Sequence, residues 1–523
     1  MENVRDILIK AQGLKQQGRM IERQQVLRKG LDFYPQNTDL ITAYIFACFA
    51  INDYPPTRDW VFKLRDLMGG KMTPLQHMAM RHYITRMAEW SWYEEELKWM
   101  KNHIDTCPVT PFYLCGLPLK LSDYKKIMKT YYHQSGLEKV PIRRFDFSNR
   151  HFSNRKIKIG FVSANWRCHP EIFQTPTFYG YLNSDEFQVY FYDNTLPNEK
   201  DMPYKQKIIQ ISPKTYKNVS TLSDTQLADL IFFDQIDILV DLGGMTTPNR
   251  NATFIQQPAP IQVSWLGYPE TLGSIPGHDY IIADSFVIPP DKRAEYPEKL
   301  LYLEPSYYPY DEFSVTEQFN VTRSELGLPK DVVVFACAGQ DYKLTPSYFK
   351  MWMRILKQVP DSVLWLYALN PVLMENLQRR AEENGVNPKR IVFFSYLEHQ
   401  KYMSALKCVD VMLDTELCGL HTTATDALFM GVPVLTCPGE RWVARVCGSI
   451  LNAMGLPELI ATTPEQYEEK AVYWGTHPKE LKKLKERVVE QAKSSDFFNS
   501  QVYARKFETL CREMIRCWEE KQI

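Results

Sequence analysis

One stretch near the C-terminal third carries polar side chains that could bind a phosphate group. After an apolar run over residues 409–413, a loop carries His421, and Thr422 and Thr423 open a helical pattern. This order predicts a strand, a loop and a helix start. Unpaired N–H groups and the helix dipole at such a start favour an anion, beside which both Thr hydroxyls would lie. Asp426, one turn on, could accept hydrogen bonds from sugar hydroxyls. The alternative is an ordinary Thr-capped helix.

Three further positions carry groups suited to proton transfer, phosphate binding or a close backbone approach. His169 directly precedes Pro170, a residue favoured in the first helical turn, and its imidazole can exchange protons near pH 7. Lys343 follows a predicted strand, where an ammonium group could stabilise the charge on a departing nucleotide. Gly243-Gly244 follows another strand. The alternatives are a loosely capping surface His, a solvated Lys and a plain turn.

Short β-rich segments alternate with helix-length segments from Arg155 onward, which predicts parallel, doubly wound sheets. The predicted strands are KIKIGFVS, QVYFYDN, DILVDLGG, PIQVSWLGY, VVVFACAG, SVLWLYAL, RIVFFSYL, VDVMLDT and PVLTCPG. Residues 287–329, rich in Pro and Tyr, read as a linker between two such sheets. Open α/β sheets bind ligands at the carboxyl ends of their strands, where the residues described above would lie.

The N-terminal part has a helical pattern. Residues 4–40 read as helix, turn at Gly18 and helix, with Pro35 near the end, which is the period of one tetratricopeptide unit. Helical patterns continue to about residue 134, and residues 138–154 form a boundary. We therefore predict an all-α, tetratricopeptide-like region over residues 1–145, a first α/β domain over 155–325, and a second over 326–523 that includes C-terminal helices.

Composition narrows the class of protein. Lys+Arg and Asp+Glu both number 62 among 523 residues, so bulk charge favours neither nucleic acid nor a membrane surface. The 11 cysteines include no C-x-x-C pair, which indicates reduced thiols in a cytosol. No apolar run of about 18 residues occurs. We predict a cytoplasmic protein without membrane insertion. The absence of any D-x-D motif argues against a donor held through a bridging metal, so neither a metal nor a resident cofactor is expected.

Ordered segments over about residues 86–518 resemble glycosyltransferase family 41, the group of the protein O-GlcNAc transferases and SPINDLY-type enzymes. The segments are AEWSWYEEELKWM, GFVSANWRCHP, IDILVDLGG, QQPAPIQVSWLGYPETLG, DYIIAD, YPEKLLYL, VPDSVLWL, LDTELCGLHTTATDAL and PGERWVARV. The resemblance implies a GT-B fold, in which two Rossmann-like domains face a cleft. It also implies metal-independent, inverting transfer from a nucleotide sugar.

The resemblance also implies roles for particular residues. His169 matches the active-site histidine, and Lys343 a contact to the donor phosphate. The other positions matched to the donor are Gln340, Leu397, Glu398, His399, Tyr402, His421, Thr422, Thr423 and Asp426. On the acceptor and sugar side we place Gly243, Gly244, Thr246, Arg250 and Tyr342. Several positions depart from the uridine-using animal enzymes, which have His and Lys where this chain has Tyr402 and His399, and Asn-Gly where it has Gly243-Gly244. Base and sugar are therefore left open.

The hypothesis from sequence is an enzyme that transfers GlcNAc or another hexose from a nucleoside diphosphate, most simply UDP, to a Ser or Thr side chain of a polypeptide. The alternatives are a different donor such as UDP-glucose or GDP-fucose, a small-molecule acceptor, or a non-catalytic adaptor that binds peptides. The sequence leaves open the catalytic base and whether copies of the chain form a homo-oligomer.

Overall fold

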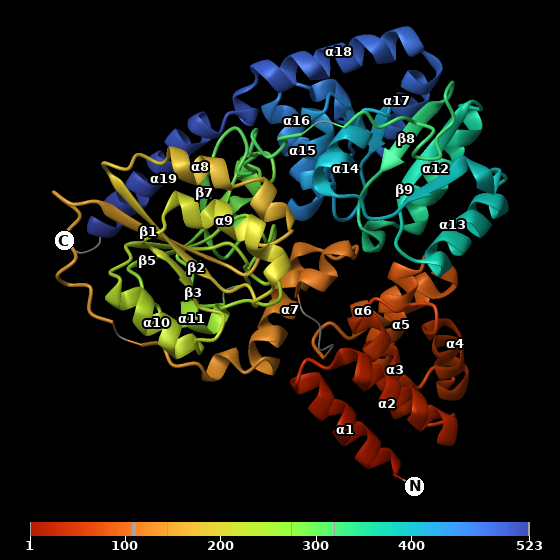
Figure 1. Cartoon of the computed structure of the whole chain (residues 1–523), viewed down its shortest axis with the longest axis horizontal. Helices are drawn as coiled ribbons and strands as arrows, with labels where there is room; N and C mark the ends of the chain where they lie inside the picture. Colours follow the sequence, from red (N-terminus) through yellow and green to blue (C-terminus); the bar gives the residue numbers. More distant parts are fainter. Residues whose placement is uncertain (1, 107–110, 144, 274, 318, 521–523) are drawn as a thin grey trace. The chain divides into compact units, whose positions relative to one another are not determined.

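Two parallel sheets and a set of N-terminal helices make up the chain in the computed structural model, which describes residues 2–106, 111–143, 145–273, 275–317 and 319–520 (Figure 1). Residues 107–110 and 144 of the predicted helical region and boundary, and residue 318 of the predicted linker, lie outside the described residues. None of the described helices is both long and apolar enough to cross a membrane.

The first sheet has the strand order β3-β2-β1-β4-β5-β6-β7, and its paired strands are parallel. Its strands are β1 Ile157–Ser163, β2 Phe187–Asp193, β3 Tyr216–Asn218, β4 Ile238–Asp241, β5 Ile261–Ser264, β6 Tyr280–Ala283 and β7 Lys299–Tyr302. The helices between them are α8 Pro176–Tyr181, α9 Met202–Ile211, α10 Asp224–Phe233 and α11 Asn251–Ile255. Every residue of β4 and β5 is buried, as expected of strands covered on both faces.

Part of the predicted linker belongs to this sheet. β7 lies inside residues 287–329 and pairs with β6, with Tyr280 opposite Lys299. The four-residue strand is flanked by Pro and Tyr, so its apolar pair Leu300-Leu301 was too short to give a periodic signal. β3, which reads Tyr-Lys-Asn and has no apolar run, was also missed, and so was β6.

The second sheet has the order β10-β9-β8-β11-β12. Its strands are β8 Val333–Cys337, β9 Ser362–Tyr367, β10 Ile391–Phe394, β11 Val411–Leu413 and β12 Val434–Leu435. The accompanying helices are α12 Pro346–Gln358, α13 Pro371–Glu383, α14 His399–Leu406, α15 Thr422–Phe429, α16 Val446–Ala453, α17 Pro464–Thr476, α18 Pro478–Ser494 and α19 Ser500–Glu519. All nine strands predicted from the sequence are present.

The C-terminal helix α19 packs against α8 of the first sheet, as Figure 1 shows. The Glu508 carboxylate accepts a hydrogen bond of 2.7 Å from the backbone N–H of Asn183. Arg512 forms an ion pair of 2.6 Å with Glu186. The end of the chain therefore covers a face of the sheet that is remote in sequence.

The N-terminal helices are α1 Val4–Gln16, α2 Met20–Phe33, α3 Thr38–Ala50, α4 Thr57–Met68, α5 Pro74–Arg86, α6 Tyr93–Asn102 and α7 Leu121–Gln134. Gly18 has a φ of +72°, which favours glycine at the predicted turn between α1 and α2. The fully buried side chains of Leu27, Ile41, Ile45 and Tyr83 belong to one apolar core. The helix, turn and helix expected over residues 4–40 are thus observed.

Contacts within the chain divide it into two compact units. One unit joins α1 to α6 with Gln340–Lys357 and Leu364–Tyr396. Within it, the Asn376 side chain on α13 donates a hydrogen bond of 2.7 Å to the carbonyl of Met87. The other unit contains the first sheet, β8 and the chain from Leu397 onward. The domain boundaries predicted from sequence stay a prediction.

Candidate functional site

The loop before α15 is held by one buried carboxylate. Asp414 follows the buried strand β11, and its Oδ1 accepts hydrogen bonds from the backbone N–H groups of Thr415, at 2.8 Å, and Leu420, at 2.5 Å. Its Oδ2 accepts one from the hydroxyl of Thr436 at 2.5 Å. The ring of His421 is fixed as well, because its Nε2 donates to the carbonyl of Val443 at 3.0 Å. The residues that precede α15 are therefore rigidly positioned.

The first turn of α15 lacks a side-chain cap. His421 occupies the N-cap position but makes no capping hydrogen bond through its side chain. The backbone N–H groups of Ala424 and Thr425 donate to the carbonyl of His421, at 2.9 and 3.1 Å, and that of Thr422 lies near the hydroxyl of Tyr308. The N–H groups of Thr422 and Thr423 remain without a backbone acceptor in the described chain, beside the positive end of the helix dipole. An anion held there would supply the missing acceptor. The predicted helix start is confirmed, and the alternative of an ordinary Thr-capped helix is not observed.

Asp426 on α15 is a buried carboxyl group without a full set of partners. The residue is 3% exposed, and among the described residues its Oδ1 has no hydrogen-bond partner. Burial raises the pKa of this carboxyl well above its ordinary value. Within the same part of the described chain, the hydroxyl of Tyr402 and Nε2 of His399 are also buried without a partner. Unsatisfied buried groups are rare and costly, so a cluster of them indicates a place completed by a ligand.

Two residues that were not predicted contact the hydroxyl of Thr422. The side-chain amide of Gln174 donates to Thr422 Oγ1 at 2.6 Å and also to the hydroxyl of Tyr308. The hydroxyls of Tyr308 and Thr422 are 2.8 Å apart. Gln174 lies five residues after His169, and Tyr308 lies in the predicted linker. No pattern in the sequence connects these segments with α15, and only the fold brings them together.

His169 serves as a cap in the structure. Its Nδ1 accepts a hydrogen bond of 3.3 Å from the backbone N–H of Glu171 at the start of a short 3-10 helix, Pro170–Phe173. Burial, and secondarily the nearby Arg167, lowers the pKa of His169 to about 3. With Nδ1 accepting, the neutral ring carries its proton on Nε2. His169 can therefore donate a hydrogen bond to a ligand, and the capping alternative raised from sequence holds at the same time.

The segment expected to contact the base, residues 397–402, contains side chains with polar atoms left for a ligand and side chains that stabilise the fold. The ring of His399 stacks on Phe173 with centroids 3.8 Å apart, and burial lowers its pKa to about 4. The carboxylate of Glu398 accepts from the backbone N–H of Gln400 at 3.0 Å and caps α14. Leu397 is half-buried. His399 and Tyr402 thus retain polar atoms for a ligand, while Glu398 has a structural task.

The glycines after β4 form a closed turn. Asp241 Oδ1 accepts from the N–H groups of Gly243 and Gly244, at 2.9 and 3.0 Å. Gly244 has a φ of +53°, and a Cβ there would lie 2.6 Å from Tyr268. Thr246 donates its hydroxyl to the Gly243 carbonyl at 2.7 Å. The plain-turn alternative accounts for these residues, and their placement on the sugar side stays a prediction.

The guanidinium group of Arg250 binds neighbouring residues of the first α/β domain. Its guanidinium donates to Asn194 Oδ1 and to the Val219 carbonyl, both at 2.9 Å, and forms an ion pair of 3.2 Å with Asp224. Three partners from three segments hold the side chain between β2, β3 and α10. This is the pattern of a structural arginine, so any contact with the acceptor stays a prediction.

Gln340, Tyr342 and Lys343 lie in the other unit of the chain. They belong to or directly precede a short 3-10 helix, Asp341–Lys343. Asp341 forms an ion pair of 2.6 Å with Arg86, whose guanidinium lies 5.1 Å from the ring centre of Tyr342. The segment is therefore anchored to α5. Its predicted contact with the donor phosphate stays a prediction.

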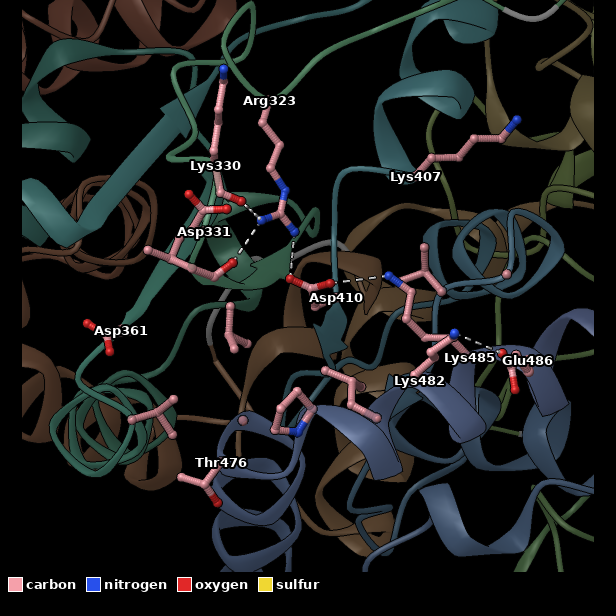
Figure 2. A pocket seen from close by; sticks show the side chains of 18 of the residues that line it. Arg323, Lys330, Asp331, Asp361, Lys407, Asp410, Thr476, Lys482, Lys485 and Glu486 are labelled. Atoms are coloured by element: carbon pink, nitrogen blue, oxygen red, sulfur yellow. Dashed lines mark hydrogen bonds and ion pairs between the residues drawn. The ribbon is translucent and has the colours of Figure 1, made fainter.

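A large pocket lies away from all predicted site residues. Its volume is about 1050 Å³, and it opens at the amino ends of β8 and β11 (Figure 2). Asp410 at its centre pairs with Arg323 at 2.7 Å and with Lys485 at 3.3 Å. The single carboxylate of Asp410 is thus shared by two cations, which ties the charged groups at the centre of the pocket to one another. Since ligands of open α/β sheets bind at the carboxyl ends of strands, the start of α15 is the better candidate site.

Comparisons with known proteins show the family of the chain. The model of the family described as Glycosyl transferase family 41 matches residues 89–320 and 310–507. The probable UDP-N-acetylglucosamine–peptide N-acetylglucosaminyltransferase SEC of Arabidopsis thaliana is 33% identical over 70% of this chain and 37% of its own length. The UDP-N-acetylglucosamine–peptide N-acetylglucosaminyltransferase of Caenorhabditis elegans is 26% identical over 74% of this chain and 43% of its own length. The chain thus spans about two fifths of these relatives.

A solved structure has the same fold over its full length. A mutant O-GlcNAc transferase of Thermobaculum terrenum superposes with a TM-score of 0.80, covers 100% of both chains and is 22% identical. The predicted GT-B class with an N-terminal helical region is thereby confirmed.

Proposed function

Because the chain belongs to glycosyltransferase family 41, we propose that it transfers a sugar from a nucleoside diphosphate to a Ser or Thr side chain of a polypeptide, with inversion and without a metal. The observation that carries this proposal is the start of α15. There, first-turn N–H groups without a side-chain cap lie one turn from the buried, unpartnered carboxyl of Asp426. An anion receptor followed by a hydrogen-bond acceptor suits a diphosphate joined to a ribose.

The proposed reaction places each charge near a suitable group. The acceptor oxygen forms a bond to the anomeric carbon while the bond to the diphosphate breaks, and the electron pair stays on the leaving phosphate. The N-terminus of α15 stabilises this charge, and the same role is proposed for Lys343 from its match to the family's donor-phosphate contact. His169, with its proton on Nε2, orients donor and acceptor by donating a hydrogen bond. The acceptor hydroxyl proton goes to a base that these residues leave unassigned.

A polypeptide acceptor is supported by a groove in the N-terminal helices. A pocket of about 670 Å³ lies along α1, α3 and α5, with apolar side chains such as Leu8, Phe46 and Leu75 beside the charged Arg23 and Asp39. Such a mixed surface suits an extended peptide better than a small, uniformly polar acceptor. UDP-GlcNAc is the donor proposed, since the relatives named above are described as N-acetylglucosaminyltransferases.

Thermal unfolding of the purified chain with nucleotides tests donor binding. We expect UDP to raise the melting temperature with EDTA as well as with Mg²⁺, because a ligand at about 100 times its Kd stabilises the folded state by about 2.7 kcal/mol. GDP, ADP and dTDP serve as comparisons, and a shift with GDP instead would indicate a fucose-type donor. If none of the four shifts the transition, the start of α15 is not a nucleotide site and the adaptor alternative is favoured.

Transfer assays test the two catalytic assignments. We expect His169→Ala and Lys343→Ala each to lower transfer or donor hydrolysis by at least about tenfold, the loss that one removed catalytic interaction causes. Lys330→Ala, at the rim of the pocket in Figure 2, is the matched control and should retain full activity. Full activity in both variants would overturn these roles.

A further inference from the structure

Three side chains from distant segments form a closed polar cluster at the first residue of α15. Gln174 comes from the loop after β1 and is 2% exposed, and Tyr308, after β7, is 4% exposed. The Gln174 amide nitrogen donates to both hydroxyls, and the hydroxyls of Tyr308 and Thr422 are 2.8 Å apart. Such burial of polar groups is costly unless their hydrogen-bonding capacity is used.

A count of protons shows a surplus of donors in this cluster. The amide of Gln174 supplies two N–H groups, and the two hydroxyls supply one O–H group each. The cluster contains three hydrogen bonds, so one hydroxyl proton has no acceptor inside it. In the described part of the chain, neither hydroxyl donates a hydrogen bond to a carboxylate or a carbonyl group. The cluster is thus rich in donors, which suits an anion.

The surroundings of Tyr308 keep its hydroxyl available as a donor. Burial raises the pKa of Tyr308, and the nearby Asp426 raises it further, so the phenol stays protonated across the physiological range. Asp426, which affects this pKa, is the same carboxyl whose Oδ1 is buried without a partner. Two independent features, a surplus of donors and an unpartnered acceptor, therefore meet at the first turns of α15.

We propose that Gln174 and Tyr308 bind the leaving phosphate of the donor. This inference rests on the proposed function. In the absence of the nucleotide sugar, the Gln174 amide and the Tyr308 hydroxyl each form a hydrogen bond with the hydroxyl of Thr422. When the donor enters, the Gln174 amide and the Tyr308 hydroxyl turn to the terminal phosphate, beside the first-turn N–H groups of α15. As the bond to the anomeric carbon breaks, its electron pair goes to an oxygen of this phosphate, and the two neutral donors stabilise the added charge.

Two near-isosteric variants test the proposal. Tyr308→Phe removes the hydroxyl, and Gln174→Leu removes the amide while keeping similar volume. Tyr310→Phe is the matched control, because Tyr310 is similarly buried and packs on Phe429 of α15, with ring centres 5.0 Å apart, but among the described residues no hydrogen bond joins it to Thr422. Binding of UDP and of uridine is measured by calorimetry, with GDP and guanosine as the second pair, and melting of each ligand-free variant confirms folding.

The expected result is selective for the diphosphate. Tyr308→Phe and Gln174→Leu should each weaken UDP binding by about tenfold or more, as for a lost hydrogen bond to a charged group, and leave uridine binding unchanged. Tyr310→Phe should change neither. Unchanged or tighter UDP binding in the first two variants would overturn the proposal, as would equal loss of UDP and uridine, since the cluster would then be structural. If the wild-type chain binds neither nucleotide, the proposed function itself fails and this inference fails with it.

Discussion

Two buried aspartates in comparable places have opposite surroundings. Asp241 ends β4 of the first sheet, and Asp426 lies one turn into α15, the helix that follows β11 of the second. Both are 3% exposed. Asp241 uses Oδ1 for two backbone N–H groups and Oδ2 for His278 Nε2 at 3.0 Å. Asp426 Oδ1 has no partner among the described residues. The first carboxylate is satisfied by the fold, whereas the second requires something that the fold does not supply.

The contrast extends to some neighbours of each aspartate, although His278 Nδ1 and Glu171 Oε1, near Asp241, are also buried without a partner in the described chain. Around Asp241, Thr246 closes the glycine turn, and Arg250 binds three partners nearby. Around Asp426, the hydroxyl of Tyr402 and Nε2 of His399 are buried without partners in the described chain. Polar groups that stabilise a fold are paired, and those that await a ligand are not.

The largest effect on stability is expected from Asp241→Asn. An amide at this position cannot serve both the glycine N–H groups and His278 as the carboxylate does, so a buried network is broken. We expect the free energy of unfolding to fall by about 3 kcal/mol, the upper part of the range for leaving a buried hydrogen-bonding group unsatisfied. Urea unfolding of wild type and variant measures the difference.

Asp426→Asn is the matched control for this change. The wild-type carboxyl there has an unpartnered oxygen, so its removal should cost less than about 1 kcal/mol or even stabilise the fold. Equal losses in the two variants would remove the distinction between a satisfied and an unsatisfied carboxyl.

A smaller change in the free energy of unfolding, about 2 kcal/mol and dependent on pH, is expected from Glu171→Gln. Glu171 lies near Asp241, and although it is buried, its Oε1 has no partner within the described residues. Burial raises the pKa of Glu171 to about 7; Ser163 and Asn165 lower it, and Asp193 and Asp241 raise it. Lys205 offsets the charge of Asp193 at 2.9 Å. Glu171 thus resembles Asp426 more than Asp241, despite belonging to the first sheet.

The sign of this effect follows from the raised pKa. The folded protein binds the Glu171 proton more tightly than the unfolded chain, so the free energy of unfolding falls as pH rises from about 4.5 to about 7. Gln stays neutral at every pH. Glu171→Gln should therefore stabilise the protein at pH 8 by on the order of 2 kcal/mol relative to its effect at pH 4. Denaturant unfolding at both pH values measures this, and a difference that does not change with pH would refute it.

The histidines His169 and His399 lower the free energy of unfolding at acidic pH. Their effect is the same in wild type and in Glu171→Gln, so it cancels when the two are compared. Burial lowers the pKa of His169 to about 3 and that of His399 to about 4. Both groups bind fewer protons in the folded state, so stability is lost as pH falls below about 6.5. Wild type and Glu171→Gln share this loss. The variant isolates the carboxyl from the imidazoles.

Much of the fold could be predicted from sequence because its strands are apolar and regularly spaced. Buried parallel strands such as β8 and β9 read as continuous apolar runs, and Gly18 marked a helix turn. β3, β6 and β7 were not predicted: β3 has no apolar run, and β6 and β7 are four-residue strands that lie among Pro, Gly and Tyr residues. Their pairing is decided by neighbouring strands.

The candidate site could be predicted only where it is local in sequence. The start of α15 was visible because strand, loop and helix follow one another, and His169 because Pro170 follows it. Gln174 and Tyr308 were not predicted, because their hydrogen bonds join residues more than 100 positions apart, and such contacts produce no motif in the sequence. Which carboxyl is paired and which is not depends on such contacts, so sequence treated Gly243, Arg250 and Asp426 alike as candidates.

The expected effect on ligand binding, about 1.4 kcal/mol, reverses the order of the two aspartates. If Asp426 accepts hydrogen bonds from ribose hydroxyls, Asp426→Asn leaves one acceptor oxygen and adds a donor that faces them. We expect uridine affinity to fall about tenfold, and UDP affinity by the same factor because the phosphate contacts are untouched. Asp241→Asn, measured at a temperature where it is folded, should leave both affinities unchanged. Calorimetric titration of the two variants decides the matter: equal loss in both would mean that nucleotide affinity follows overall stability, whereas loss confined to Asp426→Asn would show that the unpartnered carboxyl is the one that the ligand completes.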